Sequence, residues 1–192
     1  MAHFPYSEEK KDAQDTEVNN IFVHLHKNKE QSMERITRKD RRYMQLAIDL
    51  SIENVQNGGG PFGAVIVRDD KVIATGTNRV TANNDPTAHA EISAIREACT
   101  REKNFKLKGC TIYTSCEPCP MCLSAIYWAG IERIFYGNNQ QDAEEINFGD
   151  KFIYEEIART PQERSIPMRM IMREEALRAF IDWKEKEDKT PY

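Results

Sequence analysis

Apolar residues recur at helical spacing in the first well-patterned segment of the chain. After Asp40, the residues that repeat about every 3.6 positions are Met44, Ala47, Ile48, Ser51, Ile52 and Val55. The run ends at NGGG, residues 57–60, whose glycines stop a helix. Residues 62–78, FGAVIVRDDKVIATGTN, form two β-rich runs around a charged turn at Asp69 and Asp70. This pattern predicts a helix followed by a β-hairpin.

Helical and strand patterns alternate after the hairpin. Beyond a polar loop at 81–87, we expect a helix over about 88–99, a strand over 110–115, a helix over about 120–128 and a strand over 133–137. MRMIMR, residues 168–173, is typical of one more strand or extended segment, and EEALRAFIDWKEKE of a final helix. The order predicts an α/β fold, a three-layer α-β-α sandwich with a central mixed sheet of about five strands.

Length and charge narrow the class of protein. A chain of 192 residues suits one domain, which we place at 37–192, after a polar extension over 1–36. The 31 acidic and 27 basic residues give a net charge of -4, and no long basic stripe is present. Nucleic acid is therefore a disfavoured partner. Because the sequence has neither an apolar run long enough to span a bilayer nor a secretory signal at its start, we expect no membrane association and a cytoplasmic location.

The cysteines are clustered in one part of the sequence. All five lie within 24 residues, at Cys99, Cys110, Cys116, Cys119 and Cys122. A disulfide framework would be spread along the chain, so this clustering favours a metal site in a reducing compartment. We expect Cys99 and Cys110 to be buried as small apolar residues. His24 and His26, in the polar extension, are expected to be solvated surface residues.

The segment PTAHAEI, residues 86–92, supplies a histidine and a carboxylate near an expected helix start. Thirty residues after His89 comes SCEPCPMC, in which Cys119 and Cys122 form a Cys-x-x-Cys pair. One histidine and two cysteines are the ligands of a catalytic zinc whose fourth position is left to water. Glu91, if it is not a ligand, is placed to move protons between that water and a substrate. His-x-Glu followed by Pro-Cys-x-x-Cys is the signature of the zinc-dependent nucleobase deaminases.

Each of these residues has a second interpretation. A single histidine on a helix is commonly a surface or core residue, and a single Cys-x-x-Cys also serves structural zinc or redox chemistry. Cys116 adds a third thiol at the same spacing, so a closed structural Cys3His site is an alternative to the catalytic one. Such a site would leave Glu91 without a purpose. Glu117, next to the cysteine pair, is expected to orient its loop.

Longer segments carry a family resemblance. The sequences NGGGPFGAVIV, TNRVTANNDPTAHAEISAIREAC, YTSCEPCPMCLSAIYWAG and DKFIYEEI resemble the matching segments of the bacterial-type guanine deaminases, within the cytidine deaminase superfamily. The resemblance runs from about residue 40 to the C-terminus. It implies hydrolytic deamination of guanine to xanthine, with zinc held by His89, Cys119 and Cys122. Zinc-bound hydroxide would be the nucleophile and Glu91 the proton shuttle.

The resemblance also implies residues that contact the substrate. Asn78 matches a position whose amide contacts the base, and Phe62 and Trp128 match positions that line the pocket. Asp150 matches an acidic position near the substrate's amine. From the residues alone, Asn78 could equally be a turn residue at a strand end, and the two aromatics could be ordinary core. Gly149 stands where the family has an acid, which weakens the inference for Asp150.

The C-terminal segment has a role only through the resemblance. Enzymes of this type are domain-swapped homodimers, in which the C-terminal segment closes the partner's pocket and a terminal tyrosine, here Tyr192, reaches the substrate. By pattern alone, the final helix would be an amphipathic element on its own domain. Deamination of another amino-heterocycle, such as guanosine, cytosine or a tRNA adenosine, remains an alternative, as does a non-catalytic Cys3His module.

Overall fold

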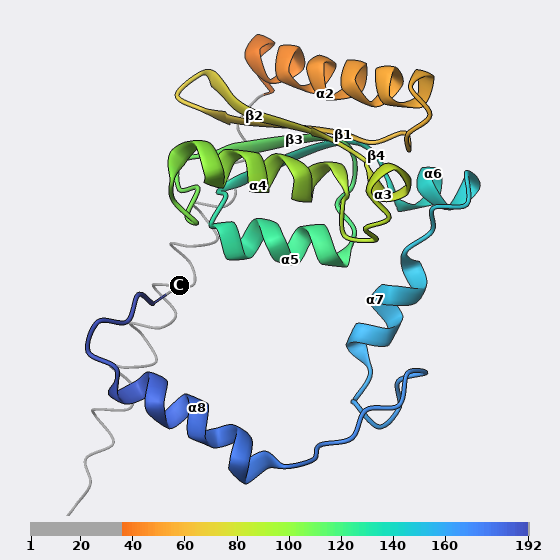
Figure 1. The fold of residues 1–192 in the computed structure, drawn as a ribbon. Helices are drawn as coiled ribbons and strands as arrows, with labels where there is room; N and C mark the ends of the chain where they lie inside the picture. The colour runs from red at the N-terminus through yellow and green to blue at the C-terminus, as the bar shows by residue number, and fades with distance from the viewer. Residues whose placement is uncertain (1–35, 192) are drawn as a thin grey trace, which may run out of the picture. The chain divides into compact units, whose positions relative to one another are not determined.

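A computed structural model of the protein describes residues 36–191 (Figure 1). The polar extension, His24, His26 and Tyr192 lie outside these residues, so the expectations for them stay predictions. The chain divides into two units, Met1–Arg38 and Lys39–Tyr192. The strands are β1 (Gly63–Arg68), β2 (Lys71–Thr77), β3 (Thr111–Cys116) and β4 (Arg133–Asn138). The helices are α2 (Arg38–Gln56), α3 (Val80–Asn83), α4 (Ala90–Glu102), α5 (Pro120–Ala129), α6 (Gln140–Glu145), α7 (Lys151–Ala158) and α8 (Arg173–Glu185).

The four strands form one mixed sheet in the order β2-β1-β3-β4. Strand β1 is antiparallel to both β2 and β3, whereas β3 and β4 are parallel. This confirms the α/β fold with a mixed central sheet, but with four strands instead of about five. The segment that we expected as a further strand or extended segment, residues 168–173, has no regular structure up to the start of α8. Its apolar pattern suits a strand, but within the described residues it pairs with no sheet edge.

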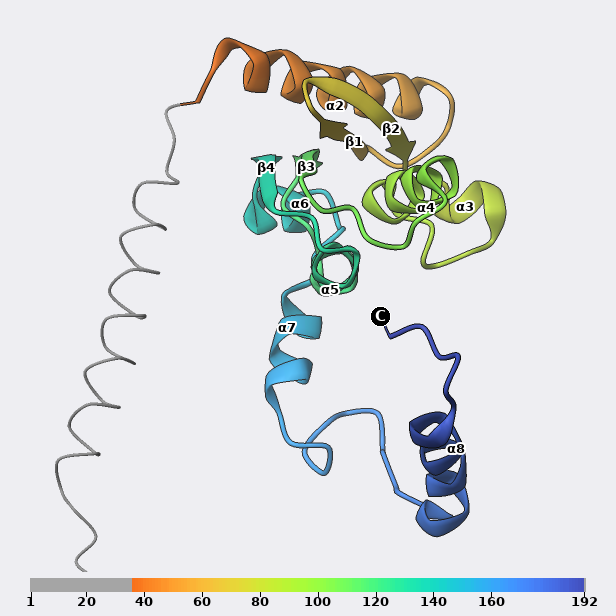
Figure 2. The same cartoon turned by 90° about the vertical axis from the view of Figure 1, so that its left-hand side faces the viewer.

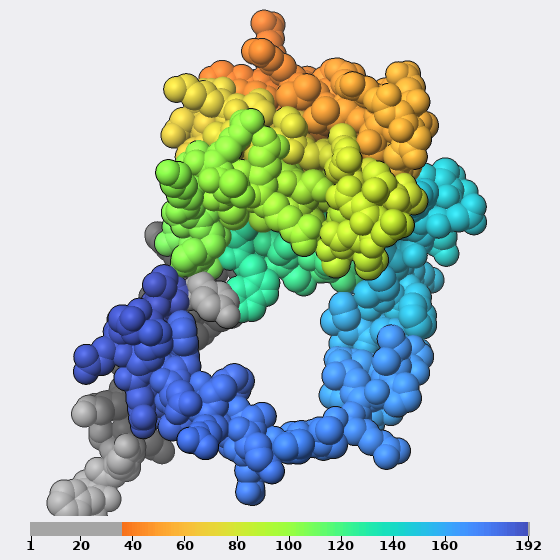
Figure 3. Space-filling model, in the orientation of Figure 1, coloured from red at the N-terminus to blue at the C-terminus, as the bar shows by residue number. Residues whose placement is uncertain are grey.

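Helices cover both faces of the sheet, with α2 on one face and α4 and α5 on the other (Figures 1 and 2). The burial of strand β1 agrees with helices on both faces, because five of its six residues are buried. Val65 and Val67 pack in the cluster that contains Tyr43 and Ala47 of α2. The alternate positions Ala64 and Ile66 pack in the cluster that contains the alanines of α4 and Ile126 of α5. A central strand buried on both faces is therefore continuously apolar. Figure 3 shows the atoms of α2 and the hairpin in continuous contact.

Two glycines let helices approach the sheet closely. A Cβ on Gly63 would lie 2.4 Å from the carbonyl oxygen of Ala47 in α2. A Cβ on Gly76 of β2 would lie 2.1 Å from the carbonyl oxygen of Ala90, at the first residue of α4. Since real Cβ atoms do not come this close, only glycine fits at either position. The beginning of α4 is thereby fixed on the sheet.

Helix α5 connects the two parallel strands. Pro120 occupies its first turn, where a missing N–H costs nothing, and Gly130 ends it in the left-handed conformation with φ 70°. The hydrogen bonds that end the helix run from the Gly130 N–H to the carbonyls of Ile126 and Tyr127. This crossover places the start of α5 near the end of β3, with only three residues between Cys116 and Pro120.

The C-terminal elements differ from the rest because they bury little. Neither α7 nor α8 contains a buried residue. The exposed large apolar residues of this part are Phe152, Ile153, Ile157, Ile166, Met168, Met170, Ile171, Met172, Phe180, Ile181 and Trp183. One described contact ties α7 to the cysteine loop, since the Tyr154 hydroxyl donates to the carbonyl oxygen of Pro118 at 3.0 Å.

Candidate active site

The loop before α4 is held by short hydrogen bonds. Asp85 Oδ1 accepts from the N–H of Thr87 at 2.8 Å and from its hydroxyl at 2.7 Å. The N–H of Arg79 donates to the carbonyl oxygen of Ala88 at 2.8 Å. His89 then takes the extended N-cap conformation, with φ −68° and ψ 161°, and Glu91 lies in the first turn of α4. The loop and the first turn of α4 orient His89 and Glu91 toward the same end of the sheet.

The two cysteines occupy the matching place at α5. Cys119 is the extended N-cap residue, with φ −62° and ψ 168°, and Cys122 lies in the first turn, where it is fully buried. The sulfur atoms of Cys119 and Cys122 each lie 3.6 Å from Nδ1 of His89. The ligand atoms of these three residues all lie within 4.8 Å of one another, and among the described residues no other such group of three is found. The structure thus brings together the three predicted metal ligands.

Zinc fits this group of atoms. With Zn–S bonds of about 2.3 Å and Zn–N bonds of about 2.0–2.1 Å, a sulfur and a nitrogen at a tetrahedral angle lie about 3.6 Å apart. That is the separation between His89 Nδ1 and each of the two sulfurs. Three protein ligands leave the fourth tetrahedral position for a water or a substrate, as in catalytic zinc sites.

Cys116 does not complete the group. Its buried thiol donates to the carbonyl oxygen of Asn139 at 3.8 Å, and Cys116 is not part of the metal-ligating cluster in the described chain. The closed Cys3His arrangement is therefore not favoured. Cys110 is fully buried, as expected, whereas Cys99 is only partly buried.

The electrostatics of the cluster suit a cation. A hydrogen bond from the Cys122 thiol, together with His89, lowers the pKa of Cys119 to about 4. The same thiolate raises the pKa of Cys122, because the two thiols share one proton. The start of α5 also favours negative charge at Cys119. A thiolate is the form in which cysteine binds zinc.

Glu91 is a buried carboxyl group beside these ligands. Only 6% of its surface is exposed, and burial raises its pKa above the usual range. A carboxyl group whose protonated form is favoured can hold a proton and deliver it within the site.

A cavity of about 540 Å³ opens in front of the cluster. Its lining includes His89, Glu91 and Cys119 on one side, and the glycine segment 58–60 on another. The sequence pattern indicated that segment only as the end of a helix. A volume of this size lies within the range of sites for small molecules.

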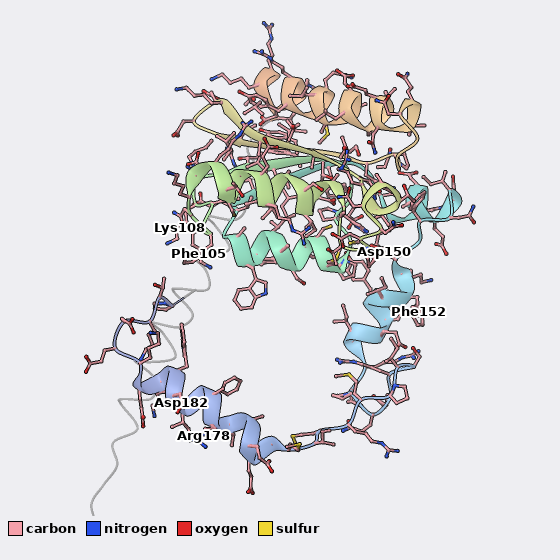
Figure 4. All side chains as sticks on the ribbon, in the orientation of Figure 1. Phe105, Lys108, Asp150, Phe152, Arg178 and Asp182 are labelled. Atoms are coloured by element: carbon pink, nitrogen blue, oxygen red, sulfur yellow. The ribbon has the colours of Figure 1, made fainter. Side chains whose placement is uncertain are left out.

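Three of the residues expected to contact a substrate line this cavity. They are Phe62, Asn78 and Asp150, and Figure 4 shows Asp150 at the start of α7. Asn78 is 7% exposed, and its side-chain Oδ1 accepts a hydrogen bond from the N–H of Val80 at 3.2 Å. Asp150 Oδ1 is buried and has no hydrogen-bond partner among the described residues.

Trp128, the fourth described residue expected to contact the substrate, does not line this cavity. It is 64% exposed and borders a separate, mostly apolar depression with Ile95, Cys99 and Phe105. The reason is its position near the last residue of α5, whereas the metal ligands lie at the first turn. Six residues of helix separate Cys122 from Trp128, which is about 9 Å along the axis.

Phe148 is a cavity residue that the sequence pattern did not single out. Its ring makes an edge-to-face contact with Phe62, with 5.1 Å between ring centroids. Both rings line the cavity, although Phe148 is 48% exposed. The one available signal was its position two residues before Asp150. Glu117 also lines the cavity and is only partly buried.

Comparisons with known proteins agree with this geometry. The family model for the cytidine and deoxycytidylate deaminase zinc-binding region matches residues 37–138. A guanine deaminase of Bacillus subtilis is 49% identical over 151 residues, which cover 78% of this chain and 97% of that protein. The crystal structure of guanine deaminase from Bacillus subtilis superposes with a TM-score of 0.77, at 48% identity, over 79% of this chain and 98% of the other.

A tRNA-specific adenosine deaminase of Buchnera aphidicola is a more partial match. It is 40% identical over 104 residues, or 54% of this chain and 69% of that protein. The match to the guanine deaminase is thus 47 residues longer than the match to the adenosine deaminase. The matched family region contains all three metal ligands and Glu91, and the chain belongs to the cytidine and deoxycytidylate deaminase family of zinc-dependent hydrolases.

Proposed function

We propose that the protein hydrolyses guanine to xanthine and ammonia. The observation that carries the proposal is the triangle of His89, Cys119 and Cys122 beside the buried Glu91, at the wall of a cavity of about 540 Å³. The guanine deaminase of Bacillus subtilis, which is 49% identical over nearly its whole length, supports guanine over the other amino-heterocycles.

His89, Cys119 and Cys122 would hold the zinc. When bound there, zinc supplies a Lewis acid that brings the pKa of a water toward neutrality. Glu91 carries the protons of the reaction. It takes one proton from the attacking water to a ring nitrogen of guanine, and then moves the hydroxyl proton to the departing amine. One water is consumed, the carbon–nitrogen bond to the exocyclic amine breaks, and ammonia leaves.

Asn78 and Asp150 would orient the base. Because the Oδ1 atom of Asn78 already accepts from the N–H of Val80, the Nδ2 group is the donor that remains to face an acceptor of the purine. Asp150 Oδ1 is buried and needs a donor, which an amino group of guanine provides. Burial raises the pKa of Asp150, and a hydrogen bond from a substrate N–H would offset that burial. The Phe62 and Phe148 rings give the flat heterocycle an apolar wall.

A homodimer is the assembly that we propose for this chain. Its support is the exposed apolar surface of the C-terminal segment, including Phe180 at 74% and Trp183 at 44% exposure. Exposed apolar surface of this kind is typical of an interface between proteins.

We propose further that Tyr192 and Trp128 act across this interface. Deleting residues 190–192 should lower turnover of guanine while the zinc content and the dimer are kept; unchanged kinetics would remove Tyr192 from the site.

A cytoplasmic location is proposed on the state of the cysteines. All five are free thiols, which suits a reducing compartment. Among the described helices, none has the length and apolar character to cross a membrane.

The test is ammonia release by protein whose zinc content has been measured. The substrates are guanine, guanosine, cytosine, adenine and a tRNA anticodon loop with an adenosine, and Glu91→Ala is the control. We expect release from guanine alone, lost in Glu91→Ala at unchanged zinc content. Release from another substrate and none from guanine would overturn the assignment of substrate while the zinc chemistry stands.

A further inference from the structure

The last full turn of α2 reaches the edge of the cavity through Asn54. Its side-chain Nδ2 donates to the carbonyl oxygen of Gly60 at 2.7 Å and to the carbonyl oxygen of Asn78 at 2.9 Å. An amide NH2 group has two hydrogens, and both are used here. The two carbonyls belong to segments that are 18 positions apart in the sequence, the glycine segment and the end of β2.

The glycine segment is shaped around this amide. A Cβ on Gly59 would lie 2.4 Å from Asn54 Nδ2, closer than any real side chain allows. A Cβ on Gly60 would come within 3.1 Å of the side chain of Asn78. Gly59 is not among the glycines with positive φ, so its backbone conformation alone does not demand glycine. The space taken by the Asn54 amide is what requires a glycine at position 59.

The Asn78 backbone is held from both sides. Its carbonyl oxygen accepts from Asn54, and its N–H donates to the carbonyl oxygen of Phe62 at 3.1 Å. Its Oδ1 is fixed by the N–H of Val80. With these three contacts in place, the Nδ2 group is held at one position in the cavity wall.

We propose that Asn54 is a positioning residue that sets substrate affinity by holding the Asn78 amide and the glycine edge together. The inference rests on the proposed function, because it takes Asn78 to be the residue that contacts the purine. Asn54 itself does not line the cavity, whereas Gly58, Gly59, Gly60 and Asn78 do. Its effect on substrate therefore passes through these neighbours.

The expected kinetic effect is on KM. The metal ligands and Glu91 come from α4 and α5, and the described hydrogen bonds of the Asn54 side chain go to neither helix. Loss of the two hydrogen bonds should lower kcat/KM for guanine by about tenfold, and by about a hundredfold at most, since each is worth about a factor of ten at most in an equilibrium. Most of that loss should be a rise in KM, with kcat little changed.

Asn54→Asp is the first variant, because it keeps the shape and replaces the two hydrogens with an oxygen that faces two carbonyl oxygens. Asn57→Asp is the matched control, since it adds the same charge three residues away at an exposed position outside the cavity lining. Gly59→Ala is a second, independent variant that pushes the Asn54 amide away from its partners. Kinetics are compared for folded protein of equal zinc content.

A double-mutant cycle distinguishes positioning from support of the fold. If Asn54 acts through Asn78, Asn54→Ala should add little to the loss of kcat/KM already caused by Asn78→Ala. A lowered Tm with unchanged KM in Asn54→Asp and Gly59→Ala, or full additivity in the cycle, would overturn the inference alone. A wild-type protein that releases no ammonia from guanine would overturn the proposed function, and this inference with it.

Discussion

Helices α4 and α8 both have 13 residues and both are amphipathic, yet they lie in opposite environments. Helix α4 buries Ala90, Glu91, Ile92, Ala94 and Ala98, and its first residue packs on Gly76 of the sheet. Helix α8 buries none, and the exposed fractions of Phe180 and Ile181 are 74% and 54%. The same pattern of apolar positions therefore predicts a helix in both cases without saying which surface covers it. For α4 that surface belongs to this chain, and for α8 we propose a second copy.

The largest effect should come from the buried carboxyl group of α4. Glu91→Gln keeps the size of the side chain and removes its ability to carry protons, so turnover of guanine should fall on the order of 10²–10⁴-fold. Zinc content and Tm should change little, because the metal ligands are intact. Steady-state kinetics with metal analysis measure both. Retention of more than a tenth of the activity would remove Glu91 from proton transfer.

The close packing of α4 on the sheet at Gly76 should give the next largest effect, on the stability of the fold. Gly76→Ala would force a Cβ toward the backbone of Ala90, which cannot move without displacing the helix, and we expect a loss of about 1–3 kcal/mol of stability. Zinc affinity should fall as well, because His89 is the N-cap of the displaced helix.

Chemical denaturation and zinc titration provide the measurements for Gly76→Ala. Gly149→Ala is the control, since the nearest atom to its new Cβ would be in the flexible side chain of Glu144, at 3.3 Å. Equal stability of Gly76→Ala and Gly149→Ala would show that the sheet tolerates the shift of α4.

The apolar face of α8 should control assembly instead of stability. Phe180→Asp combined with Ile181→Asp should leave the fold of the catalytic part intact and convert the dimer to a monomer, because charges would have to be buried in the interface. Light scattering after size exclusion gives the mass. Arg178→Gln with Lys184→Gln changes the net charge by the same amount and should stay dimeric. A wild-type protein that is itself a monomer would contradict the proposed assembly.

The smallest effect should be a pH dependence in the loop before α4. Hydrogen bonds from the Thr87 hydroxyl and N–H lower the pKa of Asp85. A carboxyl group with a lowered folded-state pKa adds stability above its unfolded pKa of about 3.9, and that stability is lost as the pH falls through the folded-state pKa. The Tm of Asp85→Asn should therefore be lower than that of the wild type near pH 7.

The acid range provides the check on the Asp85 prediction. The difference in Tm between wild type and Asp85→Asn should shrink as the pH falls below about 3.9 and through the lowered folded-state pKa of Asp85, where its side chain becomes neutral. Loss of zinc in acid affects both proteins and cancels in the comparison. A difference that stays constant with pH would mean that the charge of Asp85 is not what stabilises the loop.

The sequence predicted the metal site well because its residues are close together in two short motifs. His89 and Glu91 are two apart, Cys119 and Cys122 are three apart, and each pair lies at the start of a helix. Both helix starts could be predicted from the sequence. Because one zinc ion needs ligands from both pairs, the two helix starts were expected to lie close together. The strands within 62–78, 110–115 and 133–137 were also predicted, since each contains a short run rich in β-branched, aromatic or other apolar residues.

Other features of the fold and the site depend on contacts between segments that are far apart in the sequence, which no local pattern predicts. Helix α3 was expected as loop because its residues are polar. Residues 168–173 were expected as a strand or extended segment, and no described sheet edge receives them. Trp128 was placed in the pocket by resemblance, but the length of α5 carries it away from the ligands. The contact of Asn54 with Gly60 and Asn78 appears only when α2 and β2 are side by side.

The position of the metal ligands before β4, α7 and α8 in the chain has a consequence for biogenesis. His89, Cys119 and Cys122 have all been synthesised while the last 70 residues are still to be made. Domains fold in order of synthesis, so the site can gather its ligands on a chain that still lacks the apolar face of α8. If the protein pairs as we propose, zinc can then be bound before the two subunits meet.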